Sequence, residues 1–276
     1  MTERRHRAEE AALGATNDFS SIAARYDATR GIPEPLLASC FERLVEAAAL
    51  PPSGFVLDGG CGTGQISLPL AARGYEICGF DVSLAMVRVA RSKCRAGWSA
   101  RYSVADVRSL PVKDGACDAV IVSKLFQHVG NWQIACRELL RVLRPGACLI
   151  QVNERGAFGN AVRKHFAARA EKLGFTQRFP GLSPAADLGE FMLAEACERA
   201  PADLSVLRWE KCVSHGDALS ELEEGLFAEF WRIPGESYAG ILADTARWID
   251  RQPHGRGTVE RMQPYLSAAV FRKVGR

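Results

Sequence analysis

The stretch Phe55-Val-Leu-Asp-Gly-Gly-Cys-Gly-Thr-Gly-Gln65 decides the fold of this chain. Its apolar start has the character of a buried strand, which ends at Asp58 and runs into Gly60, Gly62 and Gly64. Glycines spaced two apart let a strand turn tightly into a helix and expose backbone N–H groups to a ligand. We therefore expect a nucleotide-like ligand above residues 60–64.

Two classes of ligand compete for such a turn. Dinucleotide-binding sheets use G-x-G-x-x-G and seat a pyrophosphate on the helix N-terminus. Here that register reads Gly62-x-Gly64-x-x-Ser67, and the carboxylate of Asp58 would repel a pyrophosphate but could hold a cationic ligand. The pattern D-x-G-x-G-x-G resembles the first motif of class I S-adenosylmethionine-dependent methyltransferases, whose ligand carries a sulfonium and an ammonium.

Strands and helices alternate after residue 51. Apolar runs predict strands at 55–57, 75–80, 98–105, 118–123 and 147–153, separated by helical patterns. Such alternation predicts right-handed crossovers and a doubly wound α/β fold with a mainly parallel sheet. Strands predicted at 204–213 and 265–274 would complete a seven-stranded sheet.

We expect a single domain over residues 1–276. Residues 1–50 are predicted to form an N-terminal helical cap, in which 18–30 has an amphipathic helical pattern. Residues 51–154 would form the cofactor-binding core, and 155–276 the C-terminal half of the core. Helical patterns at 156–182 and 217–250 predict two insertions that act as a lid.

Composition narrows the choice of partners. The chain has 35 Lys+Arg and 32 Asp+Glu, a balance that argues against a nucleic-acid surface. Its charged start is not a secretory signal, and no apolar run is long enough to span a membrane. The nine cysteines form no C-x-x-C pair, which argues against a metal site or a disulfide framework. We expect a cytoplasmic protein without a metal.

Acidic residues also follow the second and third predicted strands. Asp81 and Asp106 take corresponding places there. An acid at such a position can accept both hydroxyls of a ribose, through charge-assisted hydrogen bonds of about 1.5–3 kcal/mol each. Either residue could instead serve a local turn or a helix start. With Asp58, three predicted strands each end in an aspartate at the same edge of a parallel sheet. This arrangement favours a ligand site at that edge.

The order VLDGGCGTGQ, GFDVS, ADVRSLP, CDAVIVSKLFQHV and RELLRVLRPGACLI resembles the small-molecule methyltransferases related to the ubiquinone/menaquinone-biosynthesis type, over about residues 20–154. The resemblance implies a Rossmann-like methyltransferase fold, S-adenosylmethionine as cofactor and S-adenosylhomocysteine as product. The cofactor-binding residues that it implies are Tyr26, Arg30, Asp58, Gly60, Cys61, Gly62, Gly64, Gln65, Asp81, Val82, Asp106, Val107, Lys124 and Gln127.

The resemblance also implies a role for several of these residues. Residues 60–62 would line the methionine part of the cofactor, Asp81 the ribose, and Asp106 with Val107 the adenine. Tyr26 would close over the cofactor, with Arg30 at the methionine carboxylate. Both could instead simply hold the N-terminal helix down.

The implied reaction is in-line displacement at the sulfonium methyl, with transfer to an O, N or C atom of a small-molecule acceptor. A base is needed only if the acceptor must lose a proton. His128, in Lys124-Leu-Phe-Gln-His-Val129, is the candidate, and it could equally pack against the cofactor or cap the next helix.

Three other functions remain open. A tRNA-base methyltransferase would need a basic patch, which folding could assemble. A nicotinamide-dependent oxidoreductase would need room for a pyrophosphate beside Asp58. A non-catalytic scaffold of the same fold should have lost cofactor residues, and all the expected ones are present in this sequence.

Overall fold

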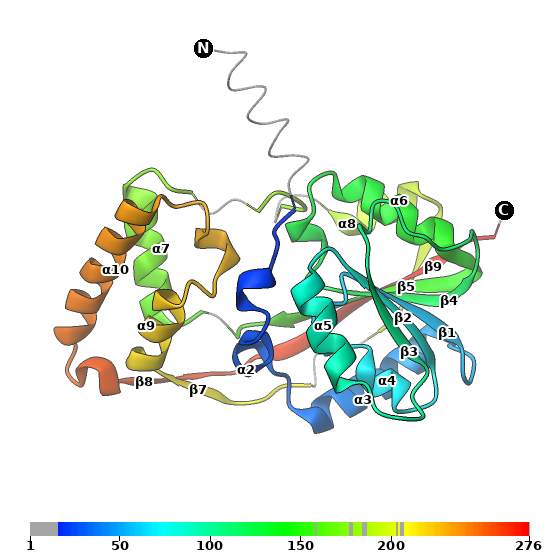
Figure 1. Cartoon of the computed structure of the whole chain (residues 1–276), viewed down its shortest axis with the longest axis horizontal. Coiled ribbons are helices and arrows are strands. Elements are labelled where there is room, and N and C mark those ends of the chain that lie inside the picture. The colour runs from blue at the N-terminus through cyan, green and yellow to red at the C-terminus, as the bar shows by residue number, and fades with distance from the viewer. Residues whose placement is uncertain are drawn as a thin grey trace, which may run out of the picture. The chain divides into compact units, whose positions relative to one another are not determined.

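The computed structural model describes residues 16–157, 159–176, 179–183, 187–202, 204 and 207–275. The chain divides into two compact units, whose elements are labelled in Figure 1. Unit 1 comprises residues 1–153, 180–207 and 266–276, and unit 2 comprises 154–179 and 208–265.

Unit 1 is built on a seven-stranded sheet with the order β3-β2-β1-β4-β5-β9-β6. Strands β1 to β5 run parallel, and β9 pairs antiparallel with β6. The doubly wound, mainly parallel seven-stranded sheet is thus confirmed. The strands are β1 Phe55–Gly59, β2 Glu76–Asp81, β3 Ala100–Val104, β4 Cys117–Ser123, β5 Leu143–Arg155, β6 Cys197–Ala200 and β9 Tyr265–Lys273.

Helices cover both faces of this sheet. Helices α3 and α4 lie on one side, and α6 and α8 lie on the other (Figure 1). Ser83 caps α5 through its Oγ, which accepts the backbone N–H of Met86 at 3.2 Å. The helices are α3 Glu34–Ala48, α4 Leu68–Ala71, α5 Leu84–Lys93, α6 Trp132–Val142 and α8 Leu188–Ala194.

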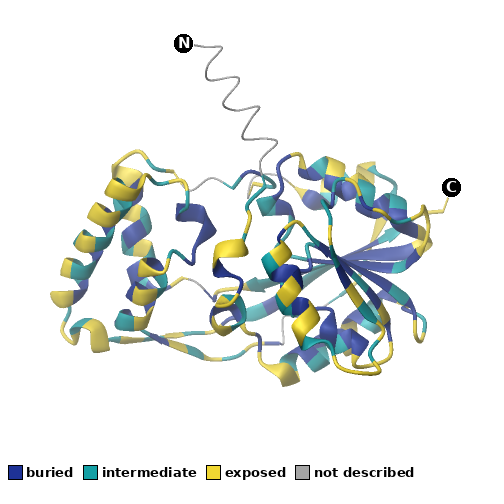
Figure 2. Cartoon of the chain, viewed as in Figure 1, coloured by how far each residue is buried: buried dark blue, intermediate teal, exposed yellow. Residues whose placement is uncertain are grey.

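The interior of unit 1 lies along the central strands, which are dark blue in Figure 2. Val56 and Leu57 of β1 and Val120 of β4 are fully buried. Parallel strands covered on both faces read as continuous apolar runs, which explains why the sequence pattern located them well.

The sixth strand of the sheet differs from the prediction. The position in the sheet expected for the strand at 204–213 is taken by β6, Cys197–Ala200, which pairs with β9. The missed strand is short and carries the charged Glu198 and Arg199, as edge strands often do. Part of the predicted stretch instead belongs to β7, Lys211–Ser214, which pairs antiparallel with β8, Val259–Met262, in unit 2.

The N-terminal segment is also less regular than its amphipathic pattern suggested. Residues 18–30 form a short 3₁₀ turn, η1 (Ser20–Ile22), followed by α2 (Tyr26–Arg30), rather than one helix. Residues 1–15 of the expected cap lie outside the described residues. Among the residues that are described, no helix is both long enough and apolar enough to cross a membrane.

Unit 2 is a group of helices around its own apolar core. Phe166 of α7, Leu222 of α9 and Ile249 of α10 are all fully buried in one cluster. Two cations of the basic helix α7 pair with acids of the same unit, Arg163 with Glu229 and Arg169 with Asp244. The helices are α7 Ala161–Lys172, α9 His215–Glu223 and α10 Gly235–Asp250.

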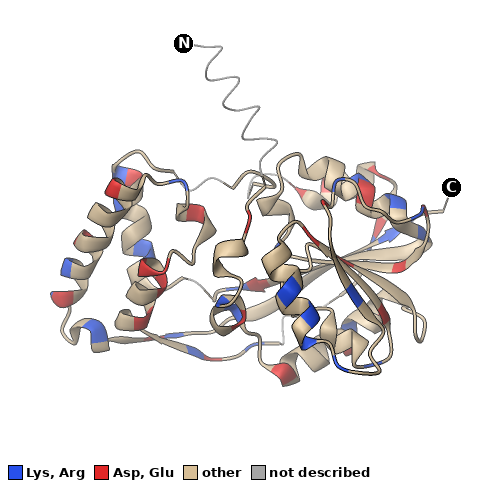
Figure 3. Cartoon of the chain, viewed as in Figure 1, with Lys and Arg blue, Asp and Glu red and all other residues tan. Residues whose placement is uncertain are grey.

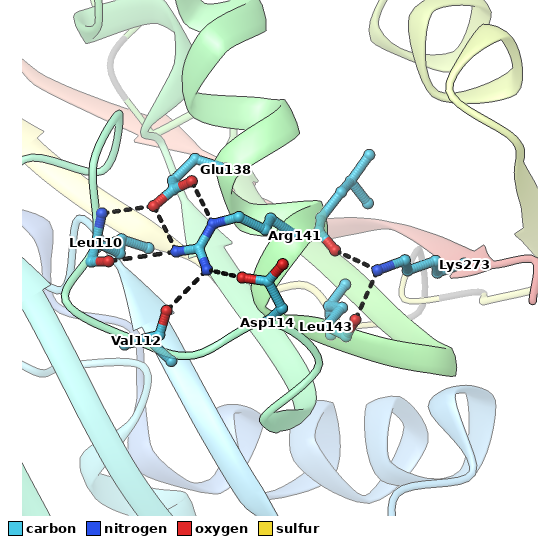
Figure 4. Close-up of polar contacts among 8 residues, drawn as sticks. Leu110, Val112, Asp114, Glu138, Arg141, Leu143 and Lys273 are labelled. Atoms are coloured by element: carbon cyan, nitrogen blue, oxygen red, sulfur yellow. Dashed lines mark hydrogen bonds and ion pairs between the residues drawn. The ribbon is translucent and has the colours of Figure 1, made fainter.

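Arg141 of α6 holds the loop between β3 and β4 in place through several hydrogen bonds (Figure 4). Arg141 donates two parallel hydrogen bonds to Glu138, each 2.7 Å long, and one of 2.5 Å to Asp114. It also donates to the carbonyl of Val112 at 2.8 Å, while Glu138 accepts the backbone N–H of Leu110 at 2.6 Å. The hydrogen bonds from Arg141 hold the pKa of Glu138 below its ordinary value.

Candidate active site

The glycine turn after β1 adopts the backbone conformation for which glycine is suited. Gly60, Gly62 and Gly64 have φ of +69°, +51° and +74°. A Cβ at Gly60 would lie 2.5 Å from Leu125, whereas a Cβ at Gly62 would meet no atom within 4 Å. At Gly64 it would come within 3.1–3.2 Å of Leu68 and Tyr102. Gly60 and Gly64 therefore serve close packing, and Gly62 leaves open space above the turn.

Asp81 links the end of β2 to this turn. Its Oδ2 accepts the backbone N–H of Gly62 and its Oδ1 that of Ser83, both at 2.9 Å. Burial raises the pKa of the carboxyl, and these two hydrogen bonds oppose the rise. The turn and the strand end are thus held in one fixed arrangement.

Asp106 follows the end of β3 and is held by Arg108. The guanidinium of Arg108 donates to both carboxylate oxygens, at 3.0 Å and 2.6 Å, and its backbone N–H donates at 2.8 Å. Burial alone would raise the pKa of Asp106, but the hydrogen bonds from Arg108 outweigh it and lower the pKa. Asp106 is therefore ionised and fixed at the sheet edge.

A hollow of about 610 Å³, a volume that includes space open to solvent, lies above the turn. Of the residues predicted from the sequence, those that line it are Tyr26, Gly60, Gly62, Asp81, Val82, Asp106, Val107, Lys124 and His128. Sequence reasoning missed seven further lining residues, which are Thr16, Asn17, Phe19, Met86, Ser123, Leu125 and Val129. Thr16 and Asn17 directly precede the predicted amphipathic stretch 18–30, and Phe19 lies within it, which was the one signal available for them.

A smaller hollow of about 360 Å³ shares several of these residues. Asp58, Cys61 and Gln65 line it together with Lys124, which adopts a φ of +52°. Asp58 is only 1% exposed, and its Oδ2 has no hydrogen-bond partner among the described residues. Burial raises the pKa of Asp58 to about 7.

Three predicted residues line neither hollow. Arg30 places its guanidinium 4.9 Å from the ring centre of Tyr26 and donates to Thr29 Oγ1 at 3.0 Å. Gln127 has its Nε2 3.3 Å from Nε2 of His128. Gly64 is the third. A side chain at this position would crowd Leu68 of α4, which explains why a glycine stands there.

The N-terminal segment, residues 16–30, forms hydrogen bonds and a salt bridge with the rest of unit 1 beside the larger hollow. The backbone N–H of Asn17 donates to the His128 carbonyl at 3.0 Å, and Ser20 Oγ lies 2.7 Å from Ser83 Oγ. Asp27 accepts from Thr63 at 2.5 Å and pairs with Lys93 at 2.7 Å. Residues 16–19 of this segment, for which the sequence analysis assigned no role, thus form part of the candidate site.

His128 lies where the N-terminal segment meets the turn η2 (Phe126–His128). Its Nδ1 is 3.1 Å from Asn17 Nδ2, and the ring of Phe19 packs edge-on at 4.9 Å. Burial, together with the positive charges of Arg30 and Lys124, lowers the pKa of His128 to about 3. The imidazole is therefore neutral at pH 7.

Known proteins with similar sequences identify the family. The sequence model of a family described as a methyltransferase domain matches residues 57–151. Demethylmenaquinone methyltransferase of Thermus thermophilus is 36% identical over 156 residues, which cover 54% of this chain and 71% of that protein. The chain belongs to the class I S-adenosylmethionine-dependent methyltransferases.

Two further likenesses agree with this family. Malonyl-[acyl-carrier protein] O-methyltransferase of Serratia marcescens is 32% identical over 132 residues, which cover 48% of this chain and 49% of that protein. The chain therefore spans about half the length of this second relative. The YcgJ protein of Bacillus subtilis shares the fold with a TM-score of 0.58, at 17% identity, over 88% of this chain and 100% of that one.

The cofactor of this methyltransferase is S-adenosylmethionine, as the sequence predicted. Family membership also removes the nicotinamide-dependent oxidoreductase from the alternatives. Which residues contact the cofactor stays a prediction.

Proposed function

We propose that this methyltransferase transfers the methyl group to an O, N or C atom of a small-molecule acceptor by in-line displacement. The observation that carries the proposal is the hollow above the glycine turn, where Gly62 leaves open space and Asp81 and Asp106 stand at neighbouring strand ends. The name of the Thermus relative, a demethylmenaquinone methyltransferase, supports an acceptor of small-molecule size.

The residues around the larger hollow suit the nucleoside part of the cofactor. Asp81 is proposed to accept the ribose hydroxyls, because its carboxylate is already aligned by two backbone N–H groups. Asp106 is proposed to accept the adenine amino group, with the backbone of Val107 beside the ring. Since Arg108 keeps Asp106 ionised, its carboxylate remains an acceptor near neutral pH.

The residues around the smaller hollow suit the methionine part. The buried Oδ2 of Asp58, which lacks a hydrogen-bond partner in the part of the chain that the structure describes, matches the need of an ammonium for an acceptor. Tyr26, which lines both hollows, is proposed to close over the cofactor. Arg30 lines neither hollow, but its guanidinium lies over the ring of Tyr26, and it is proposed to face the methionine carboxylate.

The bound cofactor supplies a methyl group on a sulfonium, which is an excellent leaving group. The residues of the chain therefore need mainly to align the acceptor and to exclude water. In such a transfer the acceptor atom would gain the methyl carbon, and the sulfur of the leaving S-adenosylhomocysteine would keep the electron pair of the broken sulfur–carbon bond. An acceptor that carries a proton on the reacting atom releases it, and His128, which lines the larger hollow, is proposed to take it. The low pKa of His128 leaves the ring neutral but also makes it a weak base.

The acceptor is proposed to be selected by residues of unit 2. The family match ends at residue 151, and unit 2 begins at residue 154, so the acceptor-specific part of the chain would lie outside the shared core. Unit 2 has a hollow of its own, of about 690 Å³, lined by Phe175, Glu229 and Arg232 among others. Arg232→Ala is expected to raise the KM for the acceptor and to leave cofactor affinity unchanged.

A tRNA substrate finds less support in the charge distribution. Figure 3 shows Lys and Arg gathered along α5. However, Lys93 forms a salt bridge with Asp27, and Arg91 donates to the carbonyl of Tyr102 at 2.8 Å. Because Lys93 and Arg91 have partners within unit 1, part of the positive charge of α5 stabilises the fold.

The first test is calorimetric titration of the full chain with S-adenosylmethionine, S-adenosylhomocysteine and, as control, NAD. We expect micromolar binding of the first two and none of NAD. A screen of small-molecule acceptors and of tRNA with radiolabelled cofactor then tests the reaction. Methyl transfer to tRNA alone would refute the proposed acceptor class, and cofactor binding with no transfer to any acceptor would favour the scaffold.

His128→Asn tests the proposed base. Asparagine keeps a polar side chain of similar reach but cannot take a proton. Turnover should fall far more than cofactor affinity. Near-normal turnover of the true acceptor would show that His128 is not the base and only packs against its neighbours.

A further inference from the structure

A pair of buried hydroxyl groups lies beside Asp58. Tyr102 belongs to β3 and Ser67 directly precedes α4, and their hydroxyl oxygens are 2.9 Å apart. Ser67 is 0% exposed, Tyr102 2% and Asp58 1%. Burial raises the pKa of Asp58, and a hydrogen bond from Ser67 opposes the rise. Two hydroxyls and one carboxyl therefore form a polar cluster within the interior of unit 1.

Tyr102 reaches this cluster from β3 because two glycines leave room for its side chain. A Cβ at Gly79 of β2 would overlap the ring of Tyr102, and a Cβ at Gly64 would lie 3.2 Å from its hydroxyl oxygen. The side chain thus extends from β3 across β2 to the turn that follows β1 (Figure 1). Burial raises the pKa of Tyr102 well above its ordinary value, so its hydroxyl keeps its proton near neutral pH.

The hydroxyl of Ser67 is not used by the helix that it precedes. A serine at the N-cap usually accepts a backbone N–H of the first helical turn. Ser67 is the N-cap residue of α4, yet its side chain makes no such hydrogen bond. It contacts Tyr102 instead, so Ser67→Ala would remove no cap from α4.

The charge of Asp58 decides the direction of these hydrogen bonds. An ionised carboxylate can only accept, so the single hydrogen of the Ser67 hydroxyl goes to Asp58. The Ser67 oxygen then accepts the hydroxyl hydrogen of Tyr102. Asp58 also lines the smaller hollow, and its Oδ2 has no hydrogen-bond partner in the described part of the chain. The carboxylate therefore has an acceptor left for a ligand.

We propose that Ser67 and Tyr102 are positioning residues, whose hydroxyls form a relay from Tyr102 through Ser67 that holds the ionised Asp58 carboxylate in place for the ammonium of the cofactor. The relay does not depend on the proposed function, whereas its use in cofactor binding rests on it. A buried carboxylate needs such donors because burial disfavours its charged form.

Other ionisable groups also face Asp58. The negative charge of Asp81 opposes its ionisation. Burial and the charges of Asp58 and Asp81 raise the pKa of the Cys61 thiol, so this neighbour is uncharged near neutral pH. Lys124 and Tyr26 line the smaller hollow with Asp58. None of these groups changes when Ser67 or Tyr102 is replaced, so a shift in the pKa of Asp58 would report on the two hydroxyls.

Carbon-13 NMR of the aspartate carboxyl groups measures the pKa of Asp58 without cofactor, and Asp58→Asn assigns its signal. A hydrogen bond to a charged group is worth about one to two pH units, so Ser67→Ala should raise this pKa by that amount. Tyr102→Phe should raise it less, because Ser67 can still donate. The double variant should match Ser67→Ala alone, because Tyr102 acts through Ser67.

Tyr75→Phe is the matched control. Tyr75 is another buried tyrosine of unit 1, which directly precedes β2 and lines neither hollow. Loss of its hydroxyl should leave the pKa of Asp58 at the wild-type value. An unchanged pKa in Ser67→Ala, additive shifts in the double variant, or equal shifts in Tyr75→Phe and Tyr102→Phe would overturn the proposal.

Calorimetric titration with S-adenosylhomocysteine separates this proposal from the proposed function. If binding requires ionised Asp58, a rise of its pKa from about 7 to about 8 should weaken binding by Ser67→Ala about fivefold at pH 7. At pH 8.5 the loss should be less than about twofold, because Asp58 is then mostly ionised in both proteins. Unchanged affinity together with the expected pKa shift would support the relay and refute the proposed role of Asp58.

Discussion

Gly62→Ala is expected to separate folding from cofactor binding. Gly62 has a φ of +51°, and a Cβ built there would meet no protein atom within 4 Å. The added methyl group would therefore cause no clash within the protein. It would instead enter the hollow above the turn, where we propose that the methionine part of the cofactor lies against the backbone.

The two effects differ in size. An alanine in the left-handed region costs about 1–2 kcal/mol, and part of this is offset because alanine restricts the unfolded chain more than glycine does. We expect a net loss of about 1 kcal/mol in the free energy of unfolding, or about 2–4 °C in Tm. Overpacking by one methyl group costs about 1–3 kcal/mol, so cofactor affinity should fall about 5- to 150-fold.

Calorimetric titration with S-adenosylhomocysteine and thermal unfolding measure the two quantities. Gly74→Ala is the control, since Gly74 also has a positive φ, of +89°, and open space around its Cβ, but does not line either hollow. It should lose stability to a similar extent and keep wild-type affinity. Affinity of Gly62→Ala within about twofold of wild type would refute the placement of the cofactor over this turn.

Three further predictions concern carboxylates and their partners. Asp81→Ala should weaken cofactor binding by about tenfold or more, at about 1.4 kcal/mol per factor of ten, and unchanged calorimetric affinity would refute the ribose assignment. An ammonium beside Asp58 would lower its pKa from about 7, so cofactor affinity should rise with pH, by up to about tenfold per unit between pH 5 and 7. Asp58→Asn should flatten this dependence, and an equally steep one in the variant would exclude Asp58 as its source. Arg141→Ala should lower the free energy of unfolding at pH 7 by about 1–3 kcal/mol. The folded-state pKa of Glu138 lies below its ordinary value of 4.5, so the stability difference between wild type and Arg141→Ala should shrink as the pH falls below 4.5 and Glu138 becomes protonated. An equal difference in the free energy of urea unfolding at pH 7 and pH 3 would contradict the pairing.

The parts of the fold that the sequence predicted well are those with strong local signals. The buried strands read as apolar runs, and glycines or acids follow them directly, as at Asp58 and Asp81. The sixth strand was misplaced because Cys197–Ala200 is only four residues long and carries two adjacent charges, so it shows no period-2 pattern. Its identity depends on pairing with β9, which no local pattern reveals.

The candidate site divides in the same way. The residues at the strand ends could be predicted because each follows its own strand. Asn17 could not, because its contact with His128 joins residues 111 positions apart. The partnership of Asp106 with Arg108 is local, yet it was missed because it depends on a side-chain orientation rather than on a residue pattern.

The position of β9 within the sheet has a consequence for how the protein is made. This strand, Tyr265–Lys273, is synthesised after the other six strands of its sheet, yet it lies between β5 and β6 rather than at an edge. Lys273 also donates to the carbonyls of Leu140 and Leu143, both at 2.8 Å (Figure 4). At about 5–20 residues per second, roughly 6 to 24 s separate the synthesis of β5 from that of β9. During that interval the backbone groups of β5 that β9 will pair with are exposed, so the nascent chain passes through a stage in which its central sheet offers an open edge to any extended neighbour.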